Sequence, residues 1–229
     1  MADKPSRAPA APPRPEPNRR VRARTYESLI QAAMDLARDG RVPSIAEMAG
    51  RAQVSRATAY RYFPSRSKLV TAVVDRSLGP VRSWKSRERD GRARVLQLFN
   101  DTFPRFTQFE PQMRAAVQLS LEHWALERAG LLAEEPYRRG HRRGLLRHAL
   151  KPLARSLSAP MHDRLMKALS VVFGIEFYIV LKDIWGSPDQ EVEAIARWVV
   201  SALVDAALRE KQARPRLAEG DPSWRSSLA

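Results

Sequence analysis

The sequence contains no cysteine among its 229 residues. Disulfide bridges, thiolate nucleophiles and cysteine-based metal sites are therefore excluded. Long apolar runs are also missing, since the longest, from Val171 to Leu181, is interrupted by Glu176 and is too short to span a bilayer. The N-terminal region lacks the apolar core of a signal peptide. We therefore expect an intracellular, cytoplasmic protein without a membrane partner.

The sequence patterns of the common enzyme classes are absent as well. There is no G-x-S-x-G nucleophile elbow, no Walker-type glycine loop and no H-E-x-x-H zinc motif. The four histidines, at positions 123, 141, 148 and 162, do not have the close spacing of metal ligands. We predict no metal, no cofactor and no enzymatic activity. An enzyme is a third alternative, and it would require catalytic turnover that depends on one of these histidines.

Acidic residues are scarce relative to basic ones. The chain has 40 Lys and Arg against 25 Asp and Glu, a net charge of +15. Such a balance fits a polyanionic partner, either nucleic acid or an acidic membrane surface. A high arginine content can also reflect the base composition of the genome. Residues 1–18 contain six prolines and predict a disordered basic arm, and we expect the arginines of 19–24 to contact DNA.

The stretch from Ser44 to Lys68 predicts two short helices joined by a tight turn and followed by a third helix start. Ser44 is the N-cap of the first helix, because Glu47 three residues later completes a capping box. Ser55 is the N-cap of the second, which has small side chains first and hydrogen-bonding side chains further along. A helix that enters a DNA major groove needs that combination, since small residues permit close approach and donors read base edges.

This stretch resembles the DNA-binding region of the TetR-like family of bacterial transcriptional regulators, whose pattern is T-[VI]-x-x-I-A-x-x-A-G-V-S-x-x-T-[LF]-Y-x-[HY]-F-x-[SN]-K. The chain departs at Gln53, usually a turn glycine, at Ala59, usually a larger core residue, and at Arg66, usually lysine. A non-glycine residue at positive φ costs roughly 1 kcal/mol, so we expect a slightly different turn. The matching residues are Ser44, Ile45, Met48, Ala49, Ala52, Val54, Ser55, Thr58, Tyr60, Tyr62, Phe63, Ser65 and Arg66.

The resemblance implies an all-α fold. It comprises an N-terminal three-helix helix-turn-helix DNA-binding domain and a C-terminal helical regulatory and dimerisation domain. We predict base-edge contacts for Arg56, Ala57 and Thr58, with Arg56 on a guanine worth roughly 1–3 kcal/mol of discrimination. Hydroxyls and charges around them would bind phosphates, although Tyr60 has an alternative place in the core. The predicted DNA-binding set is Ser44, Ser55, Arg56, Ala57, Thr58, Tyr60, Tyr62, Arg66 and Lys68.

The remaining sequence has helical spacing without strand alternation. Gly79-Pro80 marks the domain boundary, and a tilt of the helix before it could carry a ligand event to the DNA-reading helix. We predict an arm over 1–18, a DNA-binding domain over 19–80, an effector-binding and dimerisation domain over 81–212 and a flexible tail over 213–229. The predicted helices span 19–38, 44–52, 55–63, 66–78, 92–109, 112–128, 136–156, 160–185 and 189–211.

The second domain would hold a small-molecule effector in a mostly apolar cavity with a few polar groups. Aromatic and methionine stripes at helical spacing are more often plain core. Glu176 stands out, because a carboxylate inside an apolar run needs a partner. That partner is an arginine, His123 or a cationic effector, with a partner in the protein favoured. The predicted effector-binding residues are Phe103, Phe106, Met113, His123, Trp124, Phe173, Glu176 and Phe177.

The last two predicted helices are apolar on more than one face, which indicates burial on both sides. The resemblance implies that they form a four-helix bundle in a homodimer. We therefore predict a homodimeric, sequence-specific repressor that binds double-stranded operator DNA and releases it when an unknown small-molecule effector binds. The alternative is a basic helical adaptor that binds nucleic acid or an anionic membrane surface without reading sequence.

Overall fold

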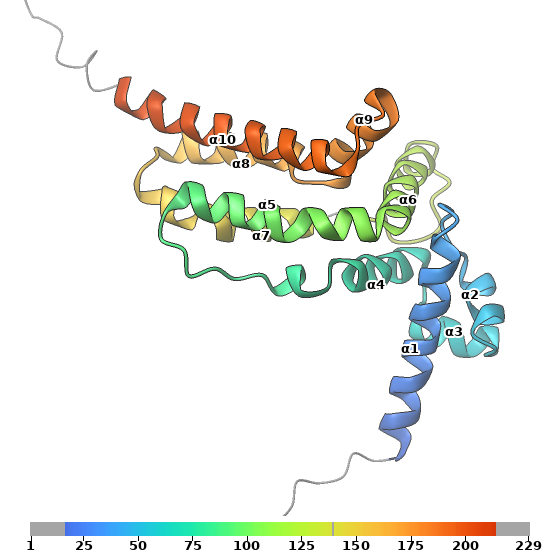
Figure 1. Ribbon diagram of the computed structural model, residues 1–229. Helices are drawn as coiled ribbons and strands as arrows, with labels where there is room; N and C mark the ends of the chain where they lie inside the picture. Colours follow the sequence, from blue (N-terminus) through green and yellow to red (C-terminus); the bar gives the residue numbers. More distant parts are fainter. Residues whose placement is uncertain (1–16, 139, 214–229) are drawn as a thin grey trace, which may run out of the picture.

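The computed structural model describes residues 17–138 and 140–213, and the regular secondary structure in these ranges is all helical, as predicted (Figure 1). The predicted arm and tail therefore lie largely outside the described residues. No described helix is long and apolar enough to cross a membrane. The elements are α1 (Pro17–Ala37), α2 (Ile45–Arg51), α3 (Arg56–Tyr62), α4 (Arg66–Leu78), η1 (Gly79–Ser83), α5 (Gly91–Gln108), α6 (Glu110–Arg128), α7 (His141–Ala149), η2 (Lys151–Arg155), α8 (Ala159–Val172), α9 (Ile175–Trp185) and α10 (Asp189–Ala213).

Helices α1 to α3 surround a small apolar core of their own. Ser44 and Glu47 form the predicted capping box at the start of α2, with hydrogen bonds of 3.0 and 3.1 Å. Gln53 has a positive φ of 55°, in the left-handed region that a turn glycine favours, so the expected change of the turn is not found at this residue. Ala59 is fully buried where α3 meets this core. A small side chain there brings the backbone of α3 close to its neighbours.

Helix α4 divides its apolar side chains between two cores. Leu69 and Val73 pack with α1 and α2, whereas Val74 and Leu78 pack with the helices that follow. Figure 1 shows α4 running from the α1–α3 group along the underside of α5, which lies between α4 and α10. Because both clusters share this helix, a displacement of α4 changes the packing of both.

The predicted single helix over 160–185 is wrong. The chain breaks between α8 and α9, where Gly174 is extended, with φ 177° and ψ 164°. A Cβ on Gly174 would lie 2.5 Å from the Glu176 carboxylate and 2.8 Å from the Arg142 guanidinium. The break therefore makes room for an ion pair between these two side chains that periodicity alone could not reveal.

The predicted helix over 136–156 is also wrong. Residues 131–138 and Gly140 are not helical, α7 is short, and Pro152 falls at the start of η2. A proline has no N–H and cannot sit deep in an α-helix without a kink, so the chain continues there as a 3-10 turn. Pro104 behaves differently, because α5 continues through it and its ring is exposed.

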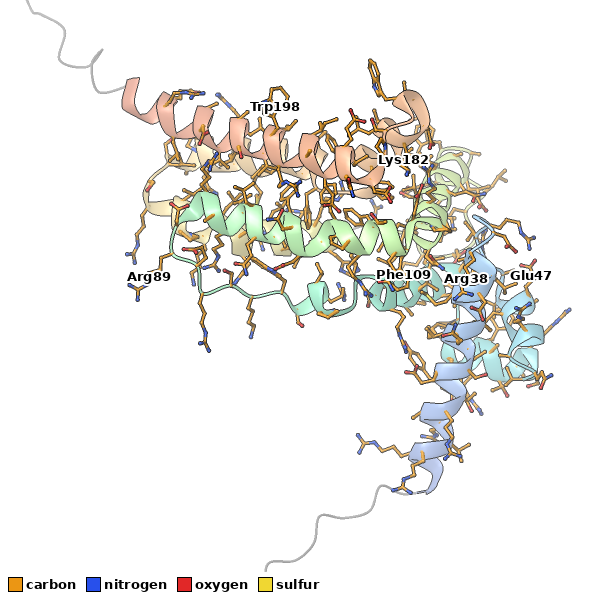
Figure 2. The ribbon with its side chains drawn as sticks, viewed as in Figure 1. Arg38, Glu47, Arg89, Phe109, Lys182 and Trp198 are labelled. Carbon is orange, nitrogen blue, oxygen red and sulfur yellow. The ribbon has the colours of Figure 1, made fainter. Side chains whose placement is uncertain are left out.

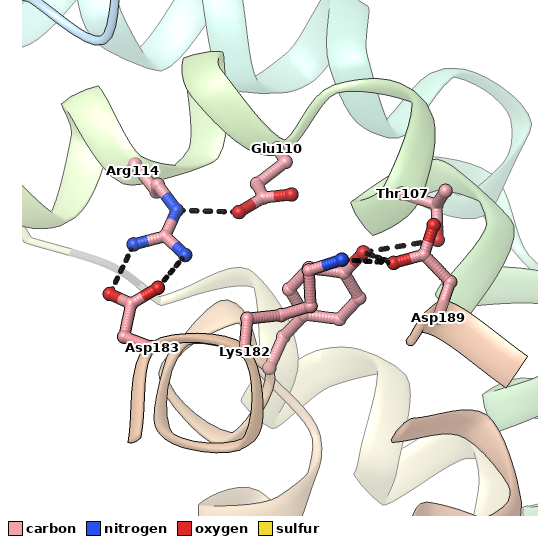
Figure 3. Close-up of polar contacts among 7 residues, drawn as sticks. Thr107, Glu110, Arg114, Lys182, Asp183 and Asp189 are labelled. Carbon is pink, nitrogen blue, oxygen red and sulfur yellow. Dashed lines mark hydrogen bonds and ion pairs between the residues drawn. The ribbon is translucent and has the colours of Figure 1, made fainter. Parts of the chain in front are cut away.

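Polar contacts fix α9 against its neighbours (Figure 3). Arg114 on α6 donates two hydrogen bonds, of 2.6 and 2.7 Å, to Asp183 on α9. Lys182 on α9 contacts Asp189 at the start of α10 at 2.7 Å, and Tyr178 donates to the same carboxylate. These hydrogen bonds hold the pKa of Asp189 below its usual range, with Lys182 as the larger cause. The polar side of α9 therefore faces the protein.

Candidate nucleic-acid interface

The outer face of α3 is small, polar and basic. Arg56, Ala57, Tyr60 and Arg61 are all exposed, and α3 places them on the side opposite the buried Ala59. Neither arginine forms an ion pair with another described residue. Tyr60 is thus a surface side chain and does not take the core position that was its alternative. Two free guanidinium groups beside a small residue can approach a polyanion closely.

The predicted serines stabilise helix ends. Ser55 Oγ accepts a 3.1 Å hydrogen bond from the Thr58 N–H and lies 3.0 Å from the Thr58 hydroxyl. Ser44 accepts from the Glu47 N–H in the same way. Each serine satisfies a helix N–H that has no intrahelical partner. Their contribution to any interface would come through the exposed part of the cap.

A basic cleft of about 350 Å³ lies between α1 and α3, lined by Arg22, Arg61 and Tyr62. The Tyr62 hydroxyl donates to the Arg22 carbonyl at 3.2 Å and so fixes α1 against α3. The sequence pointed to Tyr62 and to the arginines of 19–24, but Arg61 was left out of the site set. Its place one residue before Tyr62, on the exposed side of α3, was the available signal.

The other two basic residues of the predicted set pair with carboxylates of the same chain. Arg66 donates hydrogen bonds of 2.6 and 3.0 Å to the Glu122 carboxylate on α6. Lys68 lies 3.2 Å from the Glu135 carboxylate. The hydrogen bonds from Arg66 hold the pKa of Glu122 below its usual value. A phosphate contact of either cation stays a prediction, and it would have to compete with these carboxylates.

A chain of polar contacts connects the first turn of α4 with the middle of the molecule. The Ser67 N–H donates to the Glu134 carboxylate at 3.2 Å. Glu134 also lies 3.3 Å from Nε2 of the buried His123. Nδ1 of His123 accepts a 3.1 Å hydrogen bond from the Tyr137 N–H. Because Nδ1 is an acceptor, the neutral ring carries its proton on Nε2, which faces Glu134.

Tyr137 lines a partly open cavity of about 70 Å³. The cavity wall combines apolar side chains with a phenol, an imidazole and a guanidinium. Val74 of α4 forms part of this wall, so the cavity touches the helix that leads to α3. The lining residues are Val74, Phe106, Met113, Ala116, Tyr137, His141, Arg142 and Ile175.

The predicted effector residues occupy different places. Phe106 and Met113 line the cavity. Phe103, Phe173 and Phe177 form aromatic contacts in and around the adjoining core. His123 is buried and does not line the cavity, but it is hydrogen-bonded to Tyr137, which does. Trp124 is 61% exposed on α6, beneath the Arg128 guanidinium, and faces away from the core.

Glu176 has the protein partner that was favoured for it. Both of its carboxylate oxygens lie 2.7 Å from Arg142 Nη2, and Arg142 also donates to the Ser170 carbonyl. Arg142, Tyr137 and His141 were missed as cavity residues, because they fall in or next to the segment wrongly predicted as one long helix. A helix predicted to begin near Gly140 and to end at Pro152 would have identified them as candidate cavity residues.

Apolar side chains are left on the surface of α9 and α10. Trp198 is 72% exposed and points outward from α10 (Figure 2). Ala194, Ala202 and Ala206 are exposed on the same face, at intervals of four residues from Trp198. On α9, Ile184 and its neighbours Val180 and Trp185 are also exposed. The single chain leaves one side of these helices exposed, and burial of that side in a dimer stays a prediction. We call these residues the α9/α10 apolar face.

No protein-family model matches the sequence, and a comparison with curated proteins finds no match. Solved structures do share the fold. A TetR-family transcriptional regulator from Streptomyces coelicolor superposes with a TM-score of 0.57 at 22% identity, covering 87% of this chain and 92% of that chain. A TetR transcriptional regulator from Rhodococcus sp. RHA1 gives 0.50 at 17% identity, covering 80% and 96%. The chain therefore has the fold of TetR-family regulators.

Proposed function

We propose that this chain, which has the TetR-family fold, is a homodimeric transcriptional regulator that reads operator DNA with α3. It would act in the bacterial cytoplasm as a repressor and leave the DNA when a small molecule binds. The observation that carries the proposal is the outer face of α3. Arg56 and Arg61 are exposed beside Ala57 and form no ion pair with another described residue, whereas Arg114 and Arg142 of the second domain are paired with carboxylates.

Charge and geometry support a groove-binding role for α3. Arg56 is in its first turn, where side chains of a helix-turn-helix protein meet base edges. Arg61 and Arg22 border the cleft towards α1, where a phosphate could be held without reading sequence. We therefore assign specificity to Arg56 and general affinity to Arg61. We also propose that residues 19–80 form the DNA-binding domain and that residues 81–212 form the effector-binding and dimerisation domain.

The α9/α10 apolar face supports a second copy of the chain as a partner. Exposed tryptophan and isoleucine side chains gain about 25 cal/mol for each Å² of apolar area that an interface buries. A two-fold dimer would place two copies of α3 on one side of the assembly. Successive major grooves lie about 34–36 Å apart, so a dimer would bind an inverted repeat.

The cavity next to α4 supports release by a small molecule. Ligand pockets hold about 300–1,000 Å³, whereas this cavity holds about 70 Å³. A ligand would thus have to widen it by pushing on the wall, and Val74 belongs both to that wall and to α4. Movement of Tyr137 would at the same time disturb its hydrogen bond to His123. We expect an apolar or amphipathic ligand, because most of the lining is apolar.

The first test is selection of bound sequences from a random DNA library at about 0.15 M salt, which suppresses non-specific attraction. The proposal predicts enrichment of an inverted repeat. The Arg56→Ala variant should lose the enrichment, whereas the Arg209→Ala variant, which removes an exposed charge from α10, should keep it. Binding without enrichment that disappears as salt rises would instead favour the non-specific basic adaptor.

A further inference from the structure

A second concave site lies between the segment after η1 and the short helix η2. This basic groove has a volume of about 810 Å³. Figure 2 labels Arg89 at the end of the molecule opposite Glu47 of α2, so the groove is remote from the outer face of α3. Its charged lining consists of five basic side chains and one carboxylate, namely Arg87, Arg89, Arg94, Lys151, Arg155 and Glu88.

The cations of the basic groove lack the counterions that the chain supplies elsewhere. Arg66, Arg92 and Arg114 each pair with a carboxylate of another helix. In contrast, none of the five basic residues in the groove forms an ion pair with another described residue. Their charges therefore add up to a concentrated positive potential over a concave surface.

Arg94 provides the second, independent observation. Only 8% of Arg94 is exposed to solvent, and its buried Nε has no hydrogen-bond partner among the described residues. Its other nitrogens donate to neutral acceptors, the Glu88 carbonyl at 3.2 Å and His148 Nε2 at 2.7 Å. Burying a guanidinium without a negative partner costs several kcal/mol. A bound anion would supply the missing charge.

The two carboxylates nearest to the groove cations form hydrogen bonds with backbone N–H groups. The Glu88 carboxylate accepts the N–H groups of Arg89 and Asp90, at 2.7 and 2.9 Å. Asp90 in turn caps α5 by accepting from the Ala93 N–H. Both carboxylates are thus committed to the backbone of their own loop. These hydrogen bonds stabilise the loop, and neither carboxylate forms an ion pair with a described groove cation.

Close packing of α5 against η2 completes the groove. A Cβ on Gly91 would lie 2.3 Å from Leu153 Cδ2, so glycine permits the contact. This approach brings Lys151 and Arg155, on either side of Leu153, next to the first turns of α5. A larger residue at position 91 would separate the two walls.

We propose that the basic groove binds a small polyanion with clustered phosphate groups, of the pyrophosphate class. Arginine dominates the lining, and its planar fork matches two phosphate oxygens at once. Several unpaired cations suit a ligand with several charges in a small volume. A DNA duplex fits less well, because its phosphates lie on a convex surface and could not approach the buried Arg94. The proposal is independent of sequence reading by α3.

Isothermal titration of the full chain with inorganic pyrophosphate at about 0.15 M salt tests the site. We expect saturable binding with one pyrophosphate per chain. The exposed double variant Arg89→Ala/Arg155→Ala should weaken it by roughly tenfold or more, since each lost fork removes charge-assisted hydrogen bonds. The control Arg128→Ala/Arg209→Ala removes the same charge from α6 and α10 and should change the affinity less than about twofold.

Four results would overturn the proposal. Absence of saturable binding would show that the groove is not a pyrophosphate site. Equal weakening in both double variants would show that net charge alone attracts pyrophosphate. Tighter binding of citrate than of pyrophosphate would replace phosphate by carboxylate as the ligand chemistry. Loss of affinity for duplex DNA in Arg89→Ala/Arg155→Ala, without any pyrophosphate binding, would assign the groove to the DNA backbone. None of these variants touches Arg94, whose removal from the core could prevent folding.

Discussion

Arg66 at the start of α4 and Glu122 on α6 form a two-bond ion pair between the two apolar cores, with donor–acceptor distances of 2.6 and 3.0 Å. In this pair Glu122 holds the Arg66 guanidinium, which would otherwise be available to a DNA phosphate. The Glu122→Gln substitution should therefore raise affinity for any duplex by about two- to fivefold and increase the salt dependence by up to one phosphate contact. Anisotropy titrations at several salt concentrations measure both quantities.

The same variant should cost little stability. The side chains of Arg66 and Glu122 are 29% and 38% exposed, so solvent screening limits the pair to about 0.5–1 kcal/mol. Glu127→Gln is the matched control, because Glu127 is on the same helix and pairs with the exposed Arg138. Unchanged DNA affinity in Glu122→Gln would show that Arg66 is structural and has no phosphate to bind.

The two arginines of α3 should differ in their effects. Arg56→Ala should lower the preference for operator over scrambled DNA by about 1–3 kcal/mol, the value of one arginine–guanine contact. Arg61→Ala should weaken binding to both duplexes equally and reduce the salt slope by about one. Parallel titrations on the two duplexes separate the effects. Equal losses of preference in the two variants would contradict the division that we propose.

Trp198 should be a centre of dimerisation. Its side chain is 72% exposed in the single chain, and an aromatic residue at the middle of an interface is typically worth about 2 kcal/mol. Trp198→Asp should raise the dimer dissociation constant at least about 30-fold in sedimentation equilibrium. Leu121→Asp, at an exposed apolar site on α6, should leave it unchanged. An unaltered dimer in Trp198→Asp would move the interface to another surface.

Asp189 should contribute to stability against acid. Its pKa is lowered by hydrogen bonds from Lys182 and Tyr178, so the folded protein holds its proton less tightly than the unfolded chain. The contribution is therefore present above the unfolded pKa of 3.8 and is lost as the pH falls through the lower, folded value. Asp189→Asn should lose about 1 kcal/mol at pH 7, after allowance for partial exposure.

Urea unfolding at one protein concentration, between pH 7 and pH 3, checks this expectation. The stability of Asp189→Asn should decline less steeply than that of the parent below about pH 5. Asp163→Asn is the control, since its partner Lys167 is one helical turn away and both are well exposed. Parallel curves for the parent and Asp189→Asn would argue against this role for the carboxylate.

Local patterns predicted the elements whose signals are local. The capping box at Ser44, the cap at Ser55 and the end of α4 at Gly79 all depend on residues within a few positions. The missing turn glycine singled out Gln53, but the positive φ that Gln53 adopts was not predicted. These features describe the α2–α4 region almost completely.

The sequence-based predictions failed where the structure depends on contacts between residues far apart in the sequence. At the break, Arg142, some thirty residues away in sequence, packs against Gly174 and reaches Glu176. Tyr137 lines the cavity from a non-helical segment that was predicted as the start of a helix. Periodicity reports which face of a helix is apolar, but it contains no information on which distant side chain will approach that face. The cavity lining was therefore mostly missed.

The most direct test of the central claim is the affinity of the full chain for the selected operator and for a scrambled duplex of equal length, at about 0.15 M salt. The account predicts that two chains bind the operator at least about 10³-fold more tightly than the scrambled duplex. Equal affinities for the two duplexes, both falling steeply as salt increases, would contradict it and identify the chain as a non-specific polyanion binder.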